Sequence, residues 1–182
     1  MRTIGVAVLY TAAMCVANAG AADVAALREG DMRKLNFHSE PVPAGAEPFE
    51  TIDGEAMTLA DFAGRHVVLN FWATWCAPCR KEMPTLSALQ AALGGEDFEV
   101  VTIATGRNDP VGMQQFFDEI GVDNLPLHRD PQQRLAREMG VLGLPITVII
   151  DPEGMEIARL QGDADWSSES AMAIVAALVA GE

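Results

Sequence analysis

The residues most suited to chemical reaction are two cysteines, Cys76 and Cys79, three positions apart. An apolar run at residues 67–72 precedes them and is typical of a buried strand, whereas apolar residues after Cys76 recur at helical spacing. Cys76 is therefore expected where a strand ends and a helix begins. Free backbone amides and the positive end of the helix dipole stabilise a thiolate at such a position. The pattern predicts an exposed and reactive Cys76.

The spacing of the two cysteines indicates the reaction. Cys79 lies about one helical turn after Cys76, so the two sulfur atoms can close a small disulfide ring. Pro78 is tolerated between them because the first helical turn needs no amide donor. A dithiol with one activated sulfur is suited to thiol–disulfide exchange, with Cys76 as nucleophile and Cys79 as the resolving thiol.

Metal binding is the main alternative for a Cys-x-x-Cys pair. A structural zinc ion needs four ligands, and the remaining candidates are scattered along the chain: Cys15, His38, His66 and His128. We therefore expect no metal and interpret the three histidines as structural. A copper chaperone that uses the two soft sulfurs for Cu(I) stays an alternative.

The N-terminus resembles an export signal. Arg2 is followed by a mainly apolar run at residues 4–17 and by small residues that fit a cleavage site. The run is shorter than the approximately 20 residues that span a bilayer, so residues 1–22 are predicted to be a cleaved signal peptide, with an uncleaved anchor as the alternative. Cleavage would leave Cys76 and Cys79 as the only cysteines of an exported protein, which favours a redox function.

Composition limits the remaining possibilities. The chain has 182 residues, 49% of them hydrophobic, which is enough for one domain with a substantial core. A net charge of −14 argues against nucleic acid and anionic lipid as partners.

The order of the predicted elements indicates an α/β fold. Residues 23–45 are predicted to be an N-terminal arm and linker, and residues 46–182 the folded domain. Asp53-Gly54 predicts a hairpin within residues 49–59. Strands then alternate with helices, which implies a sheet with helices on both faces. The expected strands are 67–72, 98–104, 125–129, 146–150 and 156–160. The expected helices are 76–93, 111–120, 131–139 and a last one capped by Ser167 or Ser168.

Residues 70–84 read Asn-Phe-Trp-Ala-Thr-Trp-Cys-Ala-Pro-Cys-Arg-Lys-Glu-Met-Pro, and Gly143-Leu144-Pro145 precedes a later strand. Both stretches resemble the TlpA/ResA-like branch of the thioredoxin superfamily. The resemblance implies a thioredoxin fold with an N-terminal β-hairpin and a central strand–helix–strand insertion at residues 101–129, in a mixed sheet.

The resemblance also assigns roles at the site. It makes Glu82 the acid that adjusts the protonation of the cysteines, since a nearby carboxylate raises a thiol pKa. It makes Pro145 a cis-proline facing the cysteines, although most X-Pro bonds are trans. The residues expected to contact substrate, or to form a wall behind the cysteines, are Trp72, Trp75, Ala77, Pro78 and Leu144.

The function implied is that of a periplasmic thiol–disulfide reductase, monomeric and without a cofactor beyond the Cys76–Cys79 disulfide. Because the periplasm is oxidising, a reductase there needs electrons from a membrane donor of the CcdA or DsbD type. Its substrates would be protein disulfides, in cytochrome c maturation or in assembly of an oxidase copper site. A peroxiredoxin-type peroxidase and a DsbA-like oxidase are the other enzymatic alternatives.

Overall fold

The computed structural model describes residues 24–181, so the predicted signal peptide at residues 1–22 lies outside the described residues. These residues form one mixed, eight-stranded sheet in the order β1-β8-β7-β4-β5-β6-β2-β3. The strands are β1 (Asn36–Pro43), β2 (Phe49–Glu50), β3 (Ala56–Met57), β4 (His66–Trp72), β5 (Phe98–Thr105), β6 (His128–Asp130), β7 (Ile146–Ile150) and β8 (Met155–Gln161).

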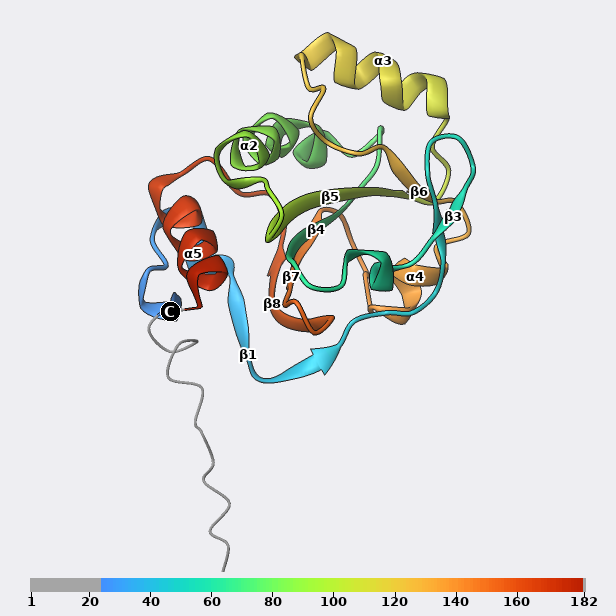
Figure 1. Ribbon diagram of the computed structural model, residues 1–182. Helices are drawn as coiled ribbons and strands as arrows, with labels where there is room; N and C mark the ends of the chain where they lie inside the picture. The colour runs from blue at the N-terminus through green and yellow to red at the C-terminus, as the bar shows by residue number, and fades with distance from the viewer. Residues whose placement is uncertain (1–23, 182) are drawn as a thin grey trace, which may run out of the picture.

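Helices cover both faces of this sheet, as the alternation of elements predicts. Helices α2 (Ala77–Leu93), α3 (Pro110–Ile120) and α5 (Glu169–Ala180) pack on one face, together with the 3-10 helix η1 (Gly30–Lys34). The other face is covered by α4 (Arg134–Glu138) and the 3-10 helix η2 (Leu59–Phe62). Figure 1 shows α2 and α5 side by side, with α4 on the opposite side of the central strands.

The central strands explain where the site lies. Strand β4 is buried along nearly its whole length, parallel to β5 and antiparallel to β7. Its side chains alternate between the two faces, with Val68 and Trp72 toward α2 and Leu69 and Phe71 toward α4. Strand β4 thus ends beneath the start of α2, at the predicted position of the cysteines.

The insertion and the hairpin are present. Strand β5, helix α3 and strand β6 follow one another, and β6 pairs in parallel with β5. Strands β2 and β3 form the antiparallel hairpin, shorter than predicted, and β2 also pairs with β6.

The prediction of an arm or linker is wrong for residues 36–43, which form β1. This strand pairs antiparallel with β8 and is interrupted by an irregularity between Phe37 and Val42. Pro41 and Pro43 suggest a linker in the sequence, but an edge strand tolerates proline because one side of its backbone needs no partner.

Two further elements begin later than predicted. The strand expected at residues 125–129 is β6 at His128–Asp130, since Pro126 has no N–H for a ladder and its carbonyl instead accepts a bond from Thr102. The helix expected at residues 131–139 is α4 at Arg134–Glu138, because Gln133 before it has a left-handed φ of 56°.

Candidate active site

Cys76 and Cys79 form a disulfide at the start of α2, with their Cα atoms 5.3 Å apart. Cys76 is the N-cap of the helix, and its sulfur accepts a hydrogen bond from the Cys79 backbone N–H at 3.3 Å. This N–H is one of the amides that a helix start leaves without an intrahelical partner. In the reduced protein the same donor would stabilise a thiolate on Cys76.

The expectation of an exposed Cys76 needs correction. Cys76 is only 5% exposed and Cys79 is fully buried. The reason is local: the Cys76 sulfur folds back over the first helical turn, where it is bonded to Cys79. Neighbouring Ala77 and Pro78 are exposed, and of the two sulfur-bearing residues Cys76 is the one with some exposed surface.

Glu82 lies one helical turn after Cys79 and is buried, with 1% of its surface exposed. Burial raises the pKa of its carboxyl from 4.5 to about 7, and hydrogen bonds donated by Asn70 and by the Ala164 backbone oppose this rise. The bonds measure 2.8 Å from Asn70 Nδ2 and 3.3 Å from the Ala164 N–H. Glu82 is therefore an interior acid that can gain or lose a proton near neutral pH.

Sequence reasoning missed the polar side chains around Glu82. Asn70 on β4 donates to Glu82 and also to Thr147 Oγ1 on β7, at 2.9 Å. The available signal was that Asn70 and Thr147 interrupt otherwise apolar buried strands.

The loop before β7 contains the Leu144–Pro145 bond, which is cis, as the resemblance implies. A groove of about 350 Å³ lies between this loop, Trp75 and α4. Its exposed apolar side chains include Trp75, 68% exposed, and Leu142, 98% exposed. Trp75 and Leu144 line the groove, which places them where a partner could contact them.

Trp72 does not contact a partner directly. It is completely buried and packs against Phe116 and Phe117 of α3, with ring centroids 5.7 and 5.5 Å away. Trp72 is therefore a core residue, and the prediction that it binds substrate is wrong.

Asn108, which precedes α3, is a second residue that sequence reasoning missed. Its Oδ1 accepts bonds from the Thr74 backbone N–H at 2.8 Å and from the Thr74 hydroxyl at 3.0 Å. Cys76 is the cap of α2. Through its bonds to Asn108, Thr74 connects the cysteine loop to the insertion.

The three histidines lie in separate environments. His38 is hydrogen-bonded to Glu156 at 2.7 Å. His128 packs with Phe49 and Phe62, and burial lowers its pKa to about 4. Within residues 24–181 no three Cys, His, Asp or Glu side chains gather as a metal site.

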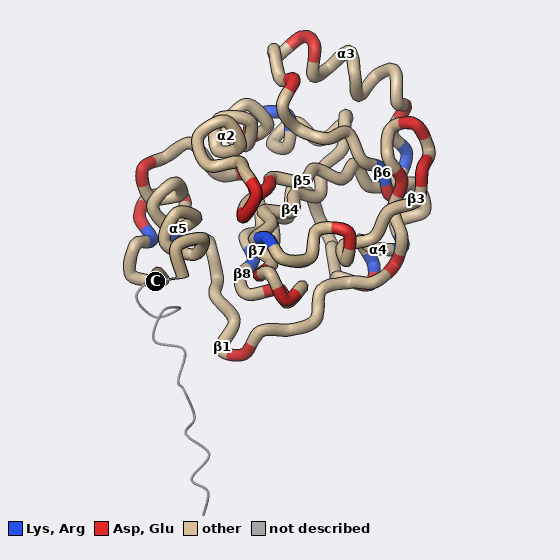
Figure 2. The backbone as a smooth tube through the Cα atoms, viewed as in Figure 1, with Lys and Arg blue, Asp and Glu red and all other residues tan. Residues whose placement is uncertain are grey.

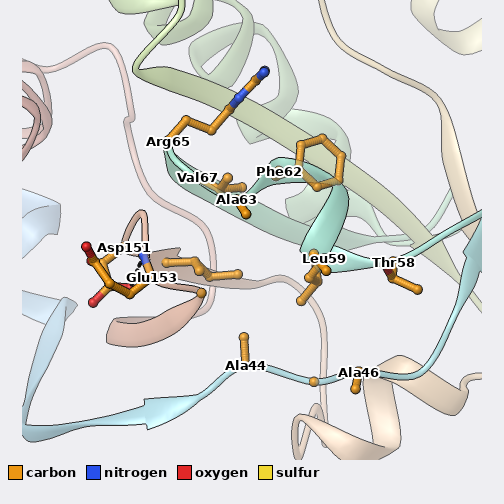
Figure 3. A pocket seen from close by; sticks show the side chains of 14 residues that line it. Ala44, Ala46, Thr58, Leu59, Phe62, Ala63, Arg65, Val67, Asp151 and Glu153 are labelled. Carbon is orange, nitrogen blue, oxygen red and sulfur yellow. Dashed lines mark hydrogen bonds between the residues drawn. The ribbon is translucent and has the colours of Figure 1, made fainter.

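The larger cavity, of about 450 Å³, lies away from this chemistry. Figure 3 shows it between Ala44, Leu59 and Phe62, near Val67 at the start of β4. The cysteines follow the opposite end of that strand.

The described residues also show how charge is distributed and whether a helix could span a membrane. Figure 2 shows acidic residues on many sides of the molecule, with fewer basic residues between them. None of the helices in residues 24–181 has the length and apolar character needed to cross a bilayer.

Comparison with known proteins gives close matches. The sequence profile of the AhpC/TSA family matches residues 40–157. The thiol-disulfide oxidoreductase ResA of Bacillus subtilis is 32% identical over 113 residues, which are 62% of each protein. The thiol:disulfide interchange protein HelX of Rhodobacter capsulatus is 35% identical over 121 residues, covering 66% of this chain and 62% of HelX. The matched part thus spans less than two thirds of these relatives.

Solved structures agree on the fold. A secreted Mycobacterium tuberculosis disulfide oxidoreductase homologous to E. coli DsbE has 29% identity and a TM-score of 0.61, covering 72% of this chain and 96% of that one. A secreted thiol-disulfide isomerase from Corynebacterium glutamicum has 21% identity and a TM-score of 0.67, covering 85% and 95%, and supports the fold alone. With its Cys-x-x-Cys pair at the start of α2 and its strand–helix–strand insertion, the chain belongs to the AhpC/TSA family and to the TlpA/ResA-like branch of the thioredoxin superfamily.

Proposed function

We propose that this protein is an exported thiol–disulfide oxidoreductase that reduces disulfides in other proteins, in the periplasm. The observation that carries the proposal is the position of Cys76 as N-cap of α2, with Cys79 buried beneath it and a groove lined by the neighbouring Trp75 beside it. The similarity to ResA, a thiol-disulfide oxidoreductase, and to HelX, a thiol:disulfide interchange protein, supports the same reaction type.

The exchange follows from the different surroundings of the two sulfurs. In the reduced protein the Cys76 thiolate attacks one sulfur of a substrate disulfide, and the substrate S–S bond breaks as the new S–S bond forms. Cys79 then gives its thiol proton to the Glu82 carboxylate, and its sulfur attacks Cys76 Sγ. The second substrate sulfur leaves, both substrate thiolates take up protons, and the protein ends as the Cys76–Cys79 disulfide.

The remaining parts of the proposal concern partners. Trp75, Ala77, Pro78 and Leu144 would contact the substrate chain around its cysteine, because they line or border the accessible side of the pair. A membrane donor of the CcdA or DsbD type would reduce the protein again. Cytochrome c maturation and oxidase copper-site assembly are the processes in which we propose to look for substrates.

The test is substrate trapping with the full chain. We expect Cys79→Ser to accumulate mixed disulfides with periplasmic proteins, and Cys76→Ser to accumulate none and to lose insulin reduction. The exposed Ser167→Ala serves as a control that keeps wild-type activity. Trapping by Cys76→Ser alone would reverse the assigned roles, and a wild-type protein that reduces no disulfide would refute the function.

The same preparations separate the alternatives. Consumption of hydrogen peroxide without a protein partner would favour a peroxidase, and copper retained in stoichiometric amount would favour a copper chaperone. A reduction potential near roughly −120 mV, the value of DsbA, would favour an oxidase over a reductase.

A further inference from the structure

The sheet face beneath α2 carries a polar layer where an apolar one would be expected. Asn70 on β4 pairs in register with Thr102 on β5 and Thr147 on β7, and all three are completely buried. The residues that flank this layer on the same face are apolar, among them Val68, Trp72 and Ile149. Buried polar groups are unfavourable unless hydrogen-bonded, so this layer calls for an explanation.

Asn70 connects this layer to the candidate acid. Its Nδ2 donates one hydrogen bond to Glu82 Oε1 at 2.8 Å and the other to Thr147 Oγ1 at 2.9 Å. The side-chain amide has two N–H donors, so both are used. Its Oδ1 is buried and has no partner among the described residues. The amide is therefore oriented to serve its two acceptors, and its own acceptor is left unsatisfied.

The orientation matters because the alternative would be repulsive. A rotated amide would turn its oxygen toward the carboxylate, which offers no hydrogen when ionised. Thr147 Oγ1 accepts the second N–H of the same Asn70 nitrogen and so holds the amide group in place, and a bond to a charged acceptor is stronger than one between neutral groups. We propose, resting on the function proposed above, that Asn70, held by Thr147, is a positioning residue that favours the ionised Glu82 carboxylate and holds it in place one helical turn after Cys79.

Other charges near Glu82 do not replace this contact. The charged group that acts on the carboxyl is Asp163 in the segment after β8, and its negative charge raises the Glu82 pKa. Asp163 is itself paired with Lys81 at 2.9 Å. The hydrogen bond from Asn70, together with that from the Ala164 N–H, lowers the Glu82 pKa against the effect of burial.

The direct test is the titration of Glu82 in the oxidised full chain by carbon NMR of labelled glutamate side chains. We expect Asn70→Leu, which keeps the volume but removes the donor, to raise the Glu82 pKa by about one to two units, the equivalent of one bond to a charged group. Thr147→Val should raise it by less, and Thr147→Ser, which keeps the hydroxyl, should leave it unchanged. Thr147→Val also keeps the test available if Asn70→Leu does not fold.

A coupled measurement separates positioning from a purely structural role. In the reduced protein, Asn70→Leu should shift the pH dependence of Cys76 alkylation, and the shift should vanish in the Glu82→Gln background. An unchanged Glu82 pKa in both Asn70→Leu and Thr147→Val, or a shift that persists without Glu82, would overturn the inference. The NMR titration needs no turnover, so its failure is distinct from a failure of the wild type to reduce disulfides.

Discussion

Replacing Glu82 by glutamine should change how the stability of the oxidised protein depends on pH. In the folded state burial raises the pKa of Glu82 from 4.5 to about 7. Between these two values the folded protein holds a proton that the unfolded chain has already released. Stability therefore falls as pH rises through this window, because the unfolded state binds fewer protons.

The magnitude follows from the difference between the two pKa values. About 2.5 pH units at about 1.4 kcal/mol each give a loss of about 3 kcal/mol, complete just above the folded pKa. Glutamine does not ionise, so Glu82→Gln removes this loss. The glutamine Oε1 can still accept the hydrogen bond from Asn70. Its NH2 group, however, is a donor and cannot accept from the Ala164 N–H, and this loss does not depend on pH.

The assay is urea unfolding of the oxidised wild type and variant at about pH 4 and about pH 8, with linear extrapolation to water. The free energy of unfolding of the wild type relative to Glu82→Gln should fall by about 3 kcal/mol between these pH values. Taking the difference cancels other titrating groups such as His128, which is common to both proteins.

A matched control is Glu96→Gln, which changes an exposed acid that makes no ion pair among the described residues. It separates the effect of losing a buried acid from that of losing a carboxylate at the surface. A free energy of unfolding of Glu82→Gln that differs from that of the wild type by the same amount at every pH would contradict this reasoning. In that case Glu82 does not titrate as a buried acid, and the proposed proton transfer from Cys79 loses its acceptor.

Three other perturbations give separate expectations. His128→Phe should remove a contribution of opposite sign: His128 adds about 3 kcal/mol of stability as pH rises from about 4 to 6.5, because the unfolded histidine stays protonated longer. The free energy of unfolding of the wild type relative to His128→Phe at several pH values reports it. Trp75→Ala should leave thermal stability nearly unchanged, since the side chain is 68% exposed, but raise KM for a protein disulfide about tenfold; an unchanged KM would remove Trp75 from the contact surface. Asn108→Ala should cost about 1–2 kcal/mol of stability and speed Cys76 alkylation, because Thr74 loses both bonds that hold the cysteine loop; stability loss with unchanged alkylation would make the contact merely structural.

The sequence predicts the centre of the fold well because the signals there are local. The apolar run at residues 67–72 corresponds to β4, and α2 ends at Leu93, as expected from Gly94 and Gly95. Cys76 and Cys79 could be assigned to a helix start from neighbouring residues alone. These features need no knowledge of which strands pair.

The features that sequence reasoning missed depend on contacts between distant segments. Strand β1 exists because residues 36–43 pair with β8, more than a hundred positions later. A helical glutamate is usually exposed, and the burial of Glu82 becomes evident only when Asn70, Thr147 and the segment at Ala164 surround it. A polar residue within each of two predicted buried strands was the visible sign, but their register was needed to bring them together.

The two sulfurs of the pair lie in opposite electrostatic environments, and this difference bears on the order of their reactions. The helix start directs an N–H at Cys76 and favours its thiolate. Cys79 is buried and one turn from the Glu82 carboxylate, and both effects disfavour a thiolate there. The protein would therefore attack with Cys76 while Cys79 stays protonated, and Cys79 would become reactive only when Glu82 accepts its proton. Because the Glu82 carboxyl has a pKa of about 7, it can accept that proton near neutral pH. The burial that destabilises the folded protein above this pH would therefore also keep Cys79 protonated and unreactive until a mixed disulfide has formed.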